Sequence, residues 1–329
     1  MLQDEHSRQM ALGLANRSSV QVIIETTILI FIAVTALVGN FCVLYVFLKS
    51  PNLRQTTSYY HIALAISSAA LTILVLPTAI GTAAIGGDYI GNQAGQVIGF
   101  IFTALILGSL YTISLISINR FFCVTKPLAY RKYFKYKFTI LTICGIWIFC
   151  LLFITGVYVS GKGTFRFYPG RFLYLLSFED LTTEKIFRAV FQVVFIIFPM
   201  CASIFCSSKV YRIVKNHNIR VAFSSNNEAT RNTIQMSRKE IRITKSLVAL
   251  VSGFIFCWMP CTTIFHIAVY MNIPREVEVY SMYTALSSFA VNPILLNMFN
   301  RPFRMQFENI FFTLKARNEI GVHQGVTNR

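Results

Sequence analysis

Long apolar segments separated by short polar connections run along almost the whole chain. Seven of them reach about 20 residues or more, the length that an α-helix needs to cross the hydrocarbon core of a bilayer. They cover residues 20–48, 57–85, 96–124, 138–160, 186–213, 241–270 and 277–298. The pattern therefore predicts an all-α fold, a bundle of seven membrane-spanning helices.

Prolines lie inside four of these segments, at Pro77, Pro199, Pro260 and Pro293. A proline removes one helical hydrogen bond, and in a membrane the neighbouring helices and waters compensate for that loss. We expect a kink at each of the four positions.

Composition and charge both fit a membrane protein. Of the 329 residues, 55% are hydrophobic and only 13% are charged, against about a quarter in soluble domains. The formal net charge of +17 would by itself suggest nucleic acid. However, 22 of the 30 Lys and Arg residues fall in alternate connections and in the C-terminal tail. We therefore expect no nucleic-acid partner and attribute the charge to membrane topology.

The side with these basic residues is expected to be cytoplasmic, where it also attracts anionic membrane lipid. Residues 1–19 are then an extracellular N-terminus, residues 20–299 the seven-transmembrane domain, and residues 316–329 a cytoplasmic tail. Between the last two, residues 300–315 carry apolar side chains at helical spacing and are predicted to form a short amphipathic eighth helix at the interface. The apolar side chains of this segment are Phe303, Phe307, Phe311 and Leu314.

The eight cysteines lie within the spans or near their cytoplasmic ends, so we expect buried thiols and no extracellular disulfide. No Cys/His spacing of the zinc-binding type occurs. Paired carboxylates, a nucleophile triad and a phosphate-binding loop are also lacking. We therefore expect no metal, no cofactor and no enzymatic activity.

Short motifs in three spans carry a resemblance to a known family. The third span ends in Asn119-Arg120-Phe121, the sixth holds Phe254 and Cys257-Trp258-Met259-Pro260, and the seventh holds Asn292-Pro293. Together they resemble the motifs of rhodopsin-like (class A) G-protein-coupled receptors, over roughly residues 20 to 312. The Asn-Arg-Phe triplet and the sixth-span pattern are most similar to the melatonin-like group of orphan receptors.

The resemblance implies a plasma-membrane receptor that activates a heterotrimeric G protein by outward movement of the sixth helix. In the family, the arginine that ends the third span pairs with an acid at the inner end of the sixth, which here indicates Arg120 and Glu240. Such an ion pair needs to supply only a few kcal/mol to bias the equilibrium between the inactive and the active state. The residues assigned to G-protein coupling and to the switch are Asn119, Arg120, Phe121, Glu240, Phe254, Trp258, Pro260, Asn292 and Pro293.

The chain departs from the family pattern at several positions. Ser68 replaces the acid of the second span, so we expect weak or absent effects of sodium, because no carboxylate is left to hold the cation. Leu296 replaces a tyrosine of the seventh span, and Gly95 stands where the family has the cysteine of its outer disulfide. These losses predict a less tethered outer loop and a less conventional switch.

The resemblance to the family also implies a ligand pocket. Phe102 occupies the place of the acid of amine receptors, and Leu286 that of the retinal-binding lysine, so neither a biogenic amine nor retinal is expected. The extracellular ligand itself is unknown. Arg188, at the outer end of the fifth span, either meets an anionic group or faces water or lipid headgroups. The expected pocket is aromatic and largely apolar and consists of Phe102, Ile106, Gln192, Trp258, His266, Tyr280, Tyr283 and Leu286.

Two other functions remain to be weighed. A transporter or channel would need charges or broken helices at a site in the middle of the membrane, and the spans offer no such acids or inverted repeat. A receptor-like protein without G-protein signalling, acting as a dimer partner or scaffold, is the alternative that Ser68, Leu296 and Gly95 leave open.

Overall fold

The computed structural model describes the backbone of residues 2–53, 56–223 and 228–310, together with most of their side chains. The side chains that it leaves out in these ranges belong to residues 2–4, 214, 217–223, 228–245 and 247. Within the described part, seven helical segments are long and apolar enough to cross a membrane, which confirms the seven predicted spans. These segments are Ser19–Lys49, Thr56–Ile85, Gly91–Thr125, Tyr136–Val159, Leu181–Ile213, Val248–Ile267 and Arg275–Phe299.

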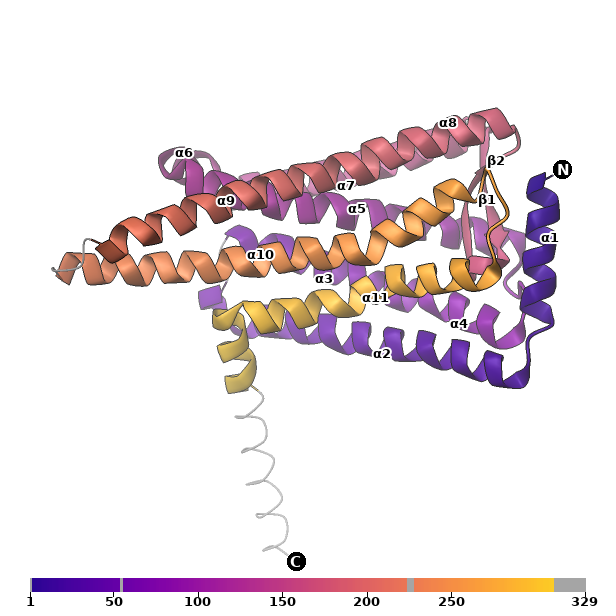
Figure 1. Ribbon diagram of the computed structural model, residues 1–329, viewed down its shortest axis with the longest axis horizontal. Coiled ribbons are helices and arrows are strands. Elements are labelled where there is room, and N and C mark those ends of the chain that lie inside the picture. Colours follow the sequence, from indigo (N-terminus) through magenta and orange to yellow (C-terminus); the bar gives the residue numbers. More distant parts are fainter. Residues whose placement is uncertain (1, 54–55, 224–227, 311–329) are drawn as a thin grey trace, which may run out of the picture.

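The helices form a closed bundle whose long axes are roughly parallel (Figure 1). The elements in chain order are α1 (Leu2–Ala15), α2 (Ser19–Lys49), η1 (Pro51–Leu53), α3 (Thr56–Leu74), α4 (Leu76–Ile85), α5 (Gly91–Thr125), α6 (Pro127–Tyr133), α7 (Tyr136–Val159), β1 (Gly163–Tyr168), η2 (Pro169–Arg171), β2 (Leu173–Phe178), α8 (Leu181–Phe191), η3 (Gln192–Ile197), α9 (Phe198–Phe223), α10 (Glu228–Ile267) and α11 (Arg275–Phe299). Around the bundle α2 packs on α3, α3 on α5, α5 on α9, α9 on α10, α10 on α11, and α11 on α2 again. The fourth span, α7, packs outside this ring against α5 and α3.

Two of the four intramembrane prolines coincide with local departures from α-helix. The second span breaks at Val75, so that α4 begins with Pro77 in its first turn, a position where the missing N–H costs nothing. Before Pro199 the fifth span contains η3, a π-helical stretch. Pro260 and Pro293 lie within α10 and α11.

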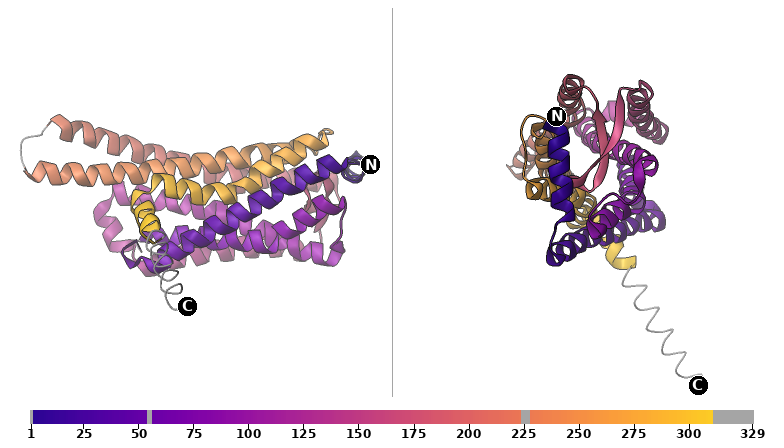
Figure 2. Two further views of the ribbon diagram at one scale, coloured as in Figure 1. Left: turned by 90° about the horizontal axis from the view of Figure 1, so that it is seen from below. Right: turned by 90° about the vertical axis from the view of Figure 1, so that its right-hand side faces the viewer.

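One end of the bundle is covered by two elements that the apolar pattern did not indicate. The strands β1 and β2 form an antiparallel hairpin in which Gly163 pairs with Phe178 and Tyr168 with Leu173. Figure 2 shows this hairpin lying across the end of the helix ring, with α1 beside it. We call this the hairpin end and the opposite one, which carries α6, the α6 end.

Beyond α11 the chain turns into a further helix, residues 301–310. Phe303 is buried against Phe47 of α2, and its ring centroid lies 5.4 Å from that of Phe47. Arg304 and Glu308 form an ion pair one turn apart on a more exposed side. This helix is the eighth helix predicted from the amphipathic pattern, and residues 311–315 of the predicted segment, with Phe311 and Leu314, lie outside the described residues.

Candidate functional site

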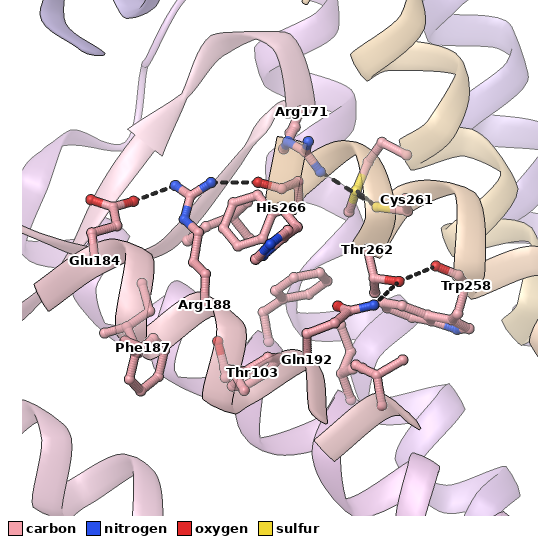
Figure 3. Close-up of a pocket in the computed structure, with 18 of the residues that line it drawn as sticks. Thr103, Arg171, Glu184, Phe187, Arg188, Gln192, Trp258, Cys261, Thr262 and His266 are labelled. Atoms are coloured by element: carbon pink, nitrogen blue, oxygen red, sulfur yellow. Dashed lines mark hydrogen bonds and ion pairs between the residues drawn. The ribbon is translucent and has the colours of Figure 1, made fainter. Parts of the chain in front are cut away.

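A cavity lies beneath the hairpin, enclosed by α5, α8, η3, α10 and α11 (Figure 3). Its volume is about 100 Å³, below the roughly 300–1,000 Å³ of typical small-molecule sites. The residues that line it are Phe102, Thr103, Ile106, Arg171, Leu175, Leu176, Phe178, Glu184, Phe187, Arg188, Phe191, Gln192, Ile196, Trp258, Cys261, Thr262, Phe265, His266 and Met282. The cavity is therefore an apolar and aromatic space with a few polar groups, closed on the side of the hairpin.

Trp258 of α10 forms part of the wall of the cavity. Its ring stacks on that of Phe254 at 5.8 Å, and its indole N–H donates to Ser288 Oγ of α11 at 3.0 Å. Gln192 lies at the start of the π-helical η3 and donates to Thr262 Oγ1 at 3.4 Å, while Thr262 donates to the Trp258 carbonyl (Figure 3). Because π-helical turns occur frequently at functional sites, the position of Gln192 fits a role in recognition.

Arg188 closes the cavity on the side of α8 and is only 5% exposed. Its guanidinium pairs with Glu184, donates to the Phe265 carbonyl at 2.5 Å and to Tyr168 Oη at 3.0 Å, and lies 3.9 Å from the centroid of the Phe265 ring. Burial raises the pKa of the Tyr168 phenol, which keeps its proton and can donate to Glu184. Arg188 thus joins α8, α10 and the hairpin within the protein, and it faces neither water nor lipid headgroups.

Arg171, in the turn of the hairpin, is a charged residue of the cavity that the sequence did not reveal, as is Glu184. Its side chain is 1% exposed and lies 4.8 Å from the Phe265 ring centroid. One terminal nitrogen, Nη1, lies 3.5 Å from Cys261 Sγ, and Nε lies 3.5 Å from Glu278 Oε2. Within the described part of the chain, Nε and Nη2 have no hydrogen-bond partner. This burial was not predictable from the sequence, because an arginine in a connection between two spans normally faces water.

The structure brings together five of the eight residues expected in the ligand pocket. Phe102 and Ile106 of α5, Gln192 of η3, and Trp258 and His266 of α10 all line the cavity. The other three lie elsewhere on α11. Leu286 is fully buried in the core, Tyr283 is buried with its ring stacked on Phe172, and Tyr280 is 63% exposed.

The hairpin is held to α5 without a disulfide, and all eight cysteines, each within the described residues, are free. A Cβ atom added to Gly95 would meet the ring of Tyr174 at 2.1 Å, so the ring occupies the space beside this glycine. The Tyr174 hydroxyl donates to Asp88, and burial together with this bond raises the pKa of the phenol. The Gln96 amide exchanges two hydrogen bonds with the backbone of Phe165, at 2.6 and 3.0 Å. The loop is therefore more firmly held than the missing cysteine suggested.

A second group of charges fixes α1 and the ends of α2 and α11 at the hairpin end. Both oxygens of Glu25 accept from Arg275, at 2.9 and 2.6 Å, and one also accepts from Arg17 at 2.6 Å. Within α1 itself, His6 Nε2 lies 3.4 Å from Glu278 Oε1 of α11. These pairs hold the N-terminal helix and the segment that follows it against the bundle.

The α6 end contains Asn119, Arg120 and Phe121 of the residues assigned to the switch. Asn119 is buried and its Oδ1 accepts from Thr57 at 3.0 Å and from Tyr130 of α6 at 3.3 Å, so it connects α3, α5 and α6. Arg120 is partly buried, and its Nε has no hydrogen-bond partner among the residues described. The backbone of Glu240 belongs to α10, but its side chain lies outside the described part. The expected ion pair between Arg120 and Glu240 therefore stays a prediction.

Phe121 contacts the rings of Phe122 and Phe205 at the same end. Near the middle of α11, both polar atoms of the buried Asn292 amide lack a partner in the described chain. Pro293 approaches Gly39 of α2 so closely that a Cβ at Gly39 would lie 2.9 Å from that of Pro293. Asn292 and Pro293 thus lie in the tightly packed contact of α11 with the bundle.

With this geometry in hand, comparison with known proteins decides the family. A model of the 7 transmembrane receptor (rhodopsin family) matches residues 39–296, well over half of the chain. The chain belongs to this family. It is therefore a multi-pass plasma-membrane receptor of the G-protein-coupled class and not an enzyme.

Individual relatives agree with this assignment. The melatonin receptor type 1A of Ovis aries is 24% identical over 294 residues, which cover 88% of this chain and 77% of that receptor. The substance-P receptor of Cavia porcellus is 24% identical over 300 residues, covering 88% of this chain and 71% of that receptor. The crystal structure of squid rhodopsin superposes with a TM-score of 0.77 at 22% identity, covering 94% of this chain and 89% of rhodopsin. The likeness to rhodopsin shows the seven-helix fold, and the melatonin receptors confirm the resemblance to the melatonin-like group.

Proposed function

We propose that the receptor binds an extracellular ligand in the cavity beneath the hairpin and activates a heterotrimeric G protein by outward movement of α10. The observation that carries the proposal is the position of Trp258. This residue lines the cavity and lies in α10 between Phe254, on which it stacks, and Pro260. A ligand that displaces the indole therefore acts directly on the helix that has to move.

The charge distribution supports the orientation that this function requires. The connections at the α6 end carry most of the Lys and Arg residues, and this end is expected to be cytoplasmic. The hairpin and α1 then lie outside the cell, where a ligand arrives. The helix 301–310, with its buried Phe303, then lies on the cytoplasmic side next to α2.

The α6 end also offers space for a partner. A groove of about 600 Å³ lies between α9 and α10 beside the end of α11, lined among others by Tyr211, Arg212 and Phe299. Outward movement of α10 relative to α9 would widen this groove. In this scheme Arg120 is held by Glu240 in the resting receptor and is released to the G protein on activation.

The relatives do not choose among ligands. One is named for melatonin and another for substance P, at equal identity to this chain. The aromatic wall of the cavity fits an apolar body, whereas Phe102 offers no counter-ion for an ammonium group. A biogenic amine and retinal are therefore not proposed as ligands.

The test is ligand-free signalling in cells that carry each class of G protein. We expect Glu240→Ala to raise basal signalling and Arg120→Ala to abolish it. Arg131→Ala, which removes an exposed arginine on α6, is the matched control and should leave the signal unchanged. If every variant reaches the cell surface and none engages a G protein, the proposal fails.

The second candidate function is a receptor-like protein without G-protein signalling, acting as a dimer partner or scaffold. The observation in its favour is the loss of polar groups along the switch. Ser68 is buried with no partner for its hydroxyl in the described chain, and Leu296 packs in an apolar cluster with Phe47 and Phe303. The signalling experiment separates the two functions, because a scaffold reaches the surface and stays silent in every variant.

A further inference from the structure

The turn of the hairpin has an unusual backbone that directs two large side chains inward. Phe172 has φ +59°, in the left-handed region that bulky side chains rarely adopt. Its ring is 1% exposed and stacks on Tyr283, while Arg171 before it is equally buried. Gly170 permits this approach, since a Cβ there would lie 2.5 Å from Glu278 Oε2. Strained positions of this kind concentrate at functional sites, so the inward placement of Arg171 calls for a functional reason.

The hydrogen bonds of Arg171 do not explain its burial. A guanidinium has five N–H donors, and a buried one is stable only when carboxylates or other acceptors satisfy them. Here Nη1 reaches only the sulfur of Cys261, a weak acceptor, and Nη2 has no partner within the described residues. The neighbouring Arg188 is the opposite case, with Glu184, the Phe265 carbonyl and Tyr168 as partners. Arg171 therefore presents donors that an acceptor in the cavity can still occupy.

The cavity shares its two arginines with the pocket beside it. Its lining contains two arginines, Arg171 and Arg188, and one carboxylate, Glu184. Glu278, the acid nearest to Arg171, lines the neighbouring pocket under α1 together with both arginines, and there it pairs with Arg171 and contacts His6. The nitrogen of Arg171 closest to Glu278 is Nε, so the terminal nitrogens remain for another group. An acceptor in the cavity would therefore bind to these terminal N–H groups, whether or not the lining carries a surplus of positive charge.

From these observations we propose that the cavity takes a small monocarboxylate with an apolar body, and that Arg171 binds its carboxylate. The inference rests on the proposed function, in that the cavity is the ligand site. Arg171 offers a fork of parallel N–H donors that matches a carboxylate, and the unpartnered Nδ1 of His266 is a further polar atom in the same lining. The apolar body lies against Phe102, Ile106 and Trp258, which carry no charge. A dianion such as a phosphate monoester is disfavoured, because both arginines already have carboxylate partners and a second negative charge would find no counter-ion.

The experiment measures binding to the purified full-length receptor in detergent by thermal shift and by titration, so it needs no G protein. The probes are hexanoate and phenylacetate, with hexanamide and phenylacetamide as neutral compounds of the same shape. We expect the carboxylates to bind about ten- to a hundredfold more tightly than the amides, as charged hydrogen bonds are worth about 1.5–3 kcal/mol. Arg171→Gln should abolish this preference.

Arg166→Gln is the matched control, since Arg166 lies on β1 of the same hairpin with its side chain 47% exposed and paired to the exposed Glu179. This variant should keep the full preference for carboxylates. If Arg171→Gln does not fold, Arg171→Lys keeps the charge but loses the fork, and should bind the carboxylates several-fold more weakly while still preferring them to the amides. The wild-type comparison of acid with amide tests the proposal without any variant.

The proposal is overturned if neither carboxylate binds, if the amides bind as tightly, or if folded Arg171→Gln keeps the preference. These results are distinct from failure of the proposed function. A receptor that signals through Arg120 but shows no preference for carboxylates refutes this inference alone. A receptor that binds carboxylates through Arg171 but engages no G protein supports this inference and refutes the signalling step.

Discussion

The carboxylate of Glu25 should be a main source of stability at the hairpin end, and Glu25→Gln tests this. The side chain accepts three hydrogen bonds, two from Arg275 and one from Arg17, and thereby links α2, α11 and the segment that follows α1. The substitution keeps the shape and one oxygen acceptor but removes the negative charge. Two buried arginines are then left without a counter-ion.

The size of the effect follows from the burial of the three groups. The side chains of Arg17, Arg275 and Glu25 are 2%, 9% and 13% exposed. Removing one partner of a buried ion pair costs about 3–5 kcal/mol, and the retained oxygen places this case near the lower end. A long chain loses about 2 °C of Tm per kcal/mol. We therefore expect Glu25→Gln to lower the Tm of the receptor by about 6 °C.

The assay is thermal unfolding of the purified receptor in one detergent, wild type beside the variants. Glu276→Gln is the control, because Glu276 is an exposed acid in the first turn of α11, where a surface substitution changes stability by about 0.5 kcal/mol at most. The combination of Glu25→Gln with Arg275→Gln should recover part of the loss, since it removes one of the unpaired charges. A Tm of Glu25→Gln within about 1 °C of the wild type would refute the claim that this buried cluster stabilises the hairpin end.

Two further substitutions test the tether of the hairpin and the polar centre of the bundle. Tyr174→Phe should lower the free energy of local opening of β2 by about 1 kcal/mol, because it deletes a hydrogen bond to the exposed Asp88. Amide hydrogen exchange in residues 173–178 should then become about fivefold faster. Tyr158→Phe, which removes an exposed hydroxyl, is the control and should leave the exchange rate unchanged. Replacing sodium by choline at constant ionic strength should leave the Tm and basal signalling unchanged, because Ser68 provides no carboxylate. Ser68→Asp should introduce a dependence on sodium, and a sodium effect in the wild type would contradict this reasoning.

The spans were predictable because lipid imposes a length and a composition on each of them. A helix that crosses a bilayer satisfies its own backbone and exposes apolar side chains, so its limits can be recognised in the sequence alone. The eighth helix was predictable for a similar reason, as Phe303 and Phe307 recur at helical spacing. Five of the expected pocket residues, Trp258 and His266 among them, line the cavity. Their place along each predicted span determines how deep in the membrane they lie, so the sequence could indicate them.

The hairpin end was not predictable, since its structure depends on contacts between residues far apart in the chain. Arg171 is buried by a strained turn, and Glu25 meets Arg275 across 250 residues. Nothing in the local sequence around Arg171 distinguishes it from a solvent-exposed arginine of a loop. Glu25 did carry a signal, because an acid inside an apolar span needs a partner, but the sequence did not say which arginine supplies it.

The most direct test of the proposed signalling function is nucleotide exchange on purified G proteins by the receptor reconstituted in lipid. Our account predicts that Glu240→Ala accelerates exchange for at least one class of G protein, and that adding Arg120→Ala returns the rate to that of the G protein alone. If the folded Glu240→Ala receptor accelerates exchange on no class, the account of a switch between Arg120 and Glu240 is contradicted, and the scaffold function becomes the better description.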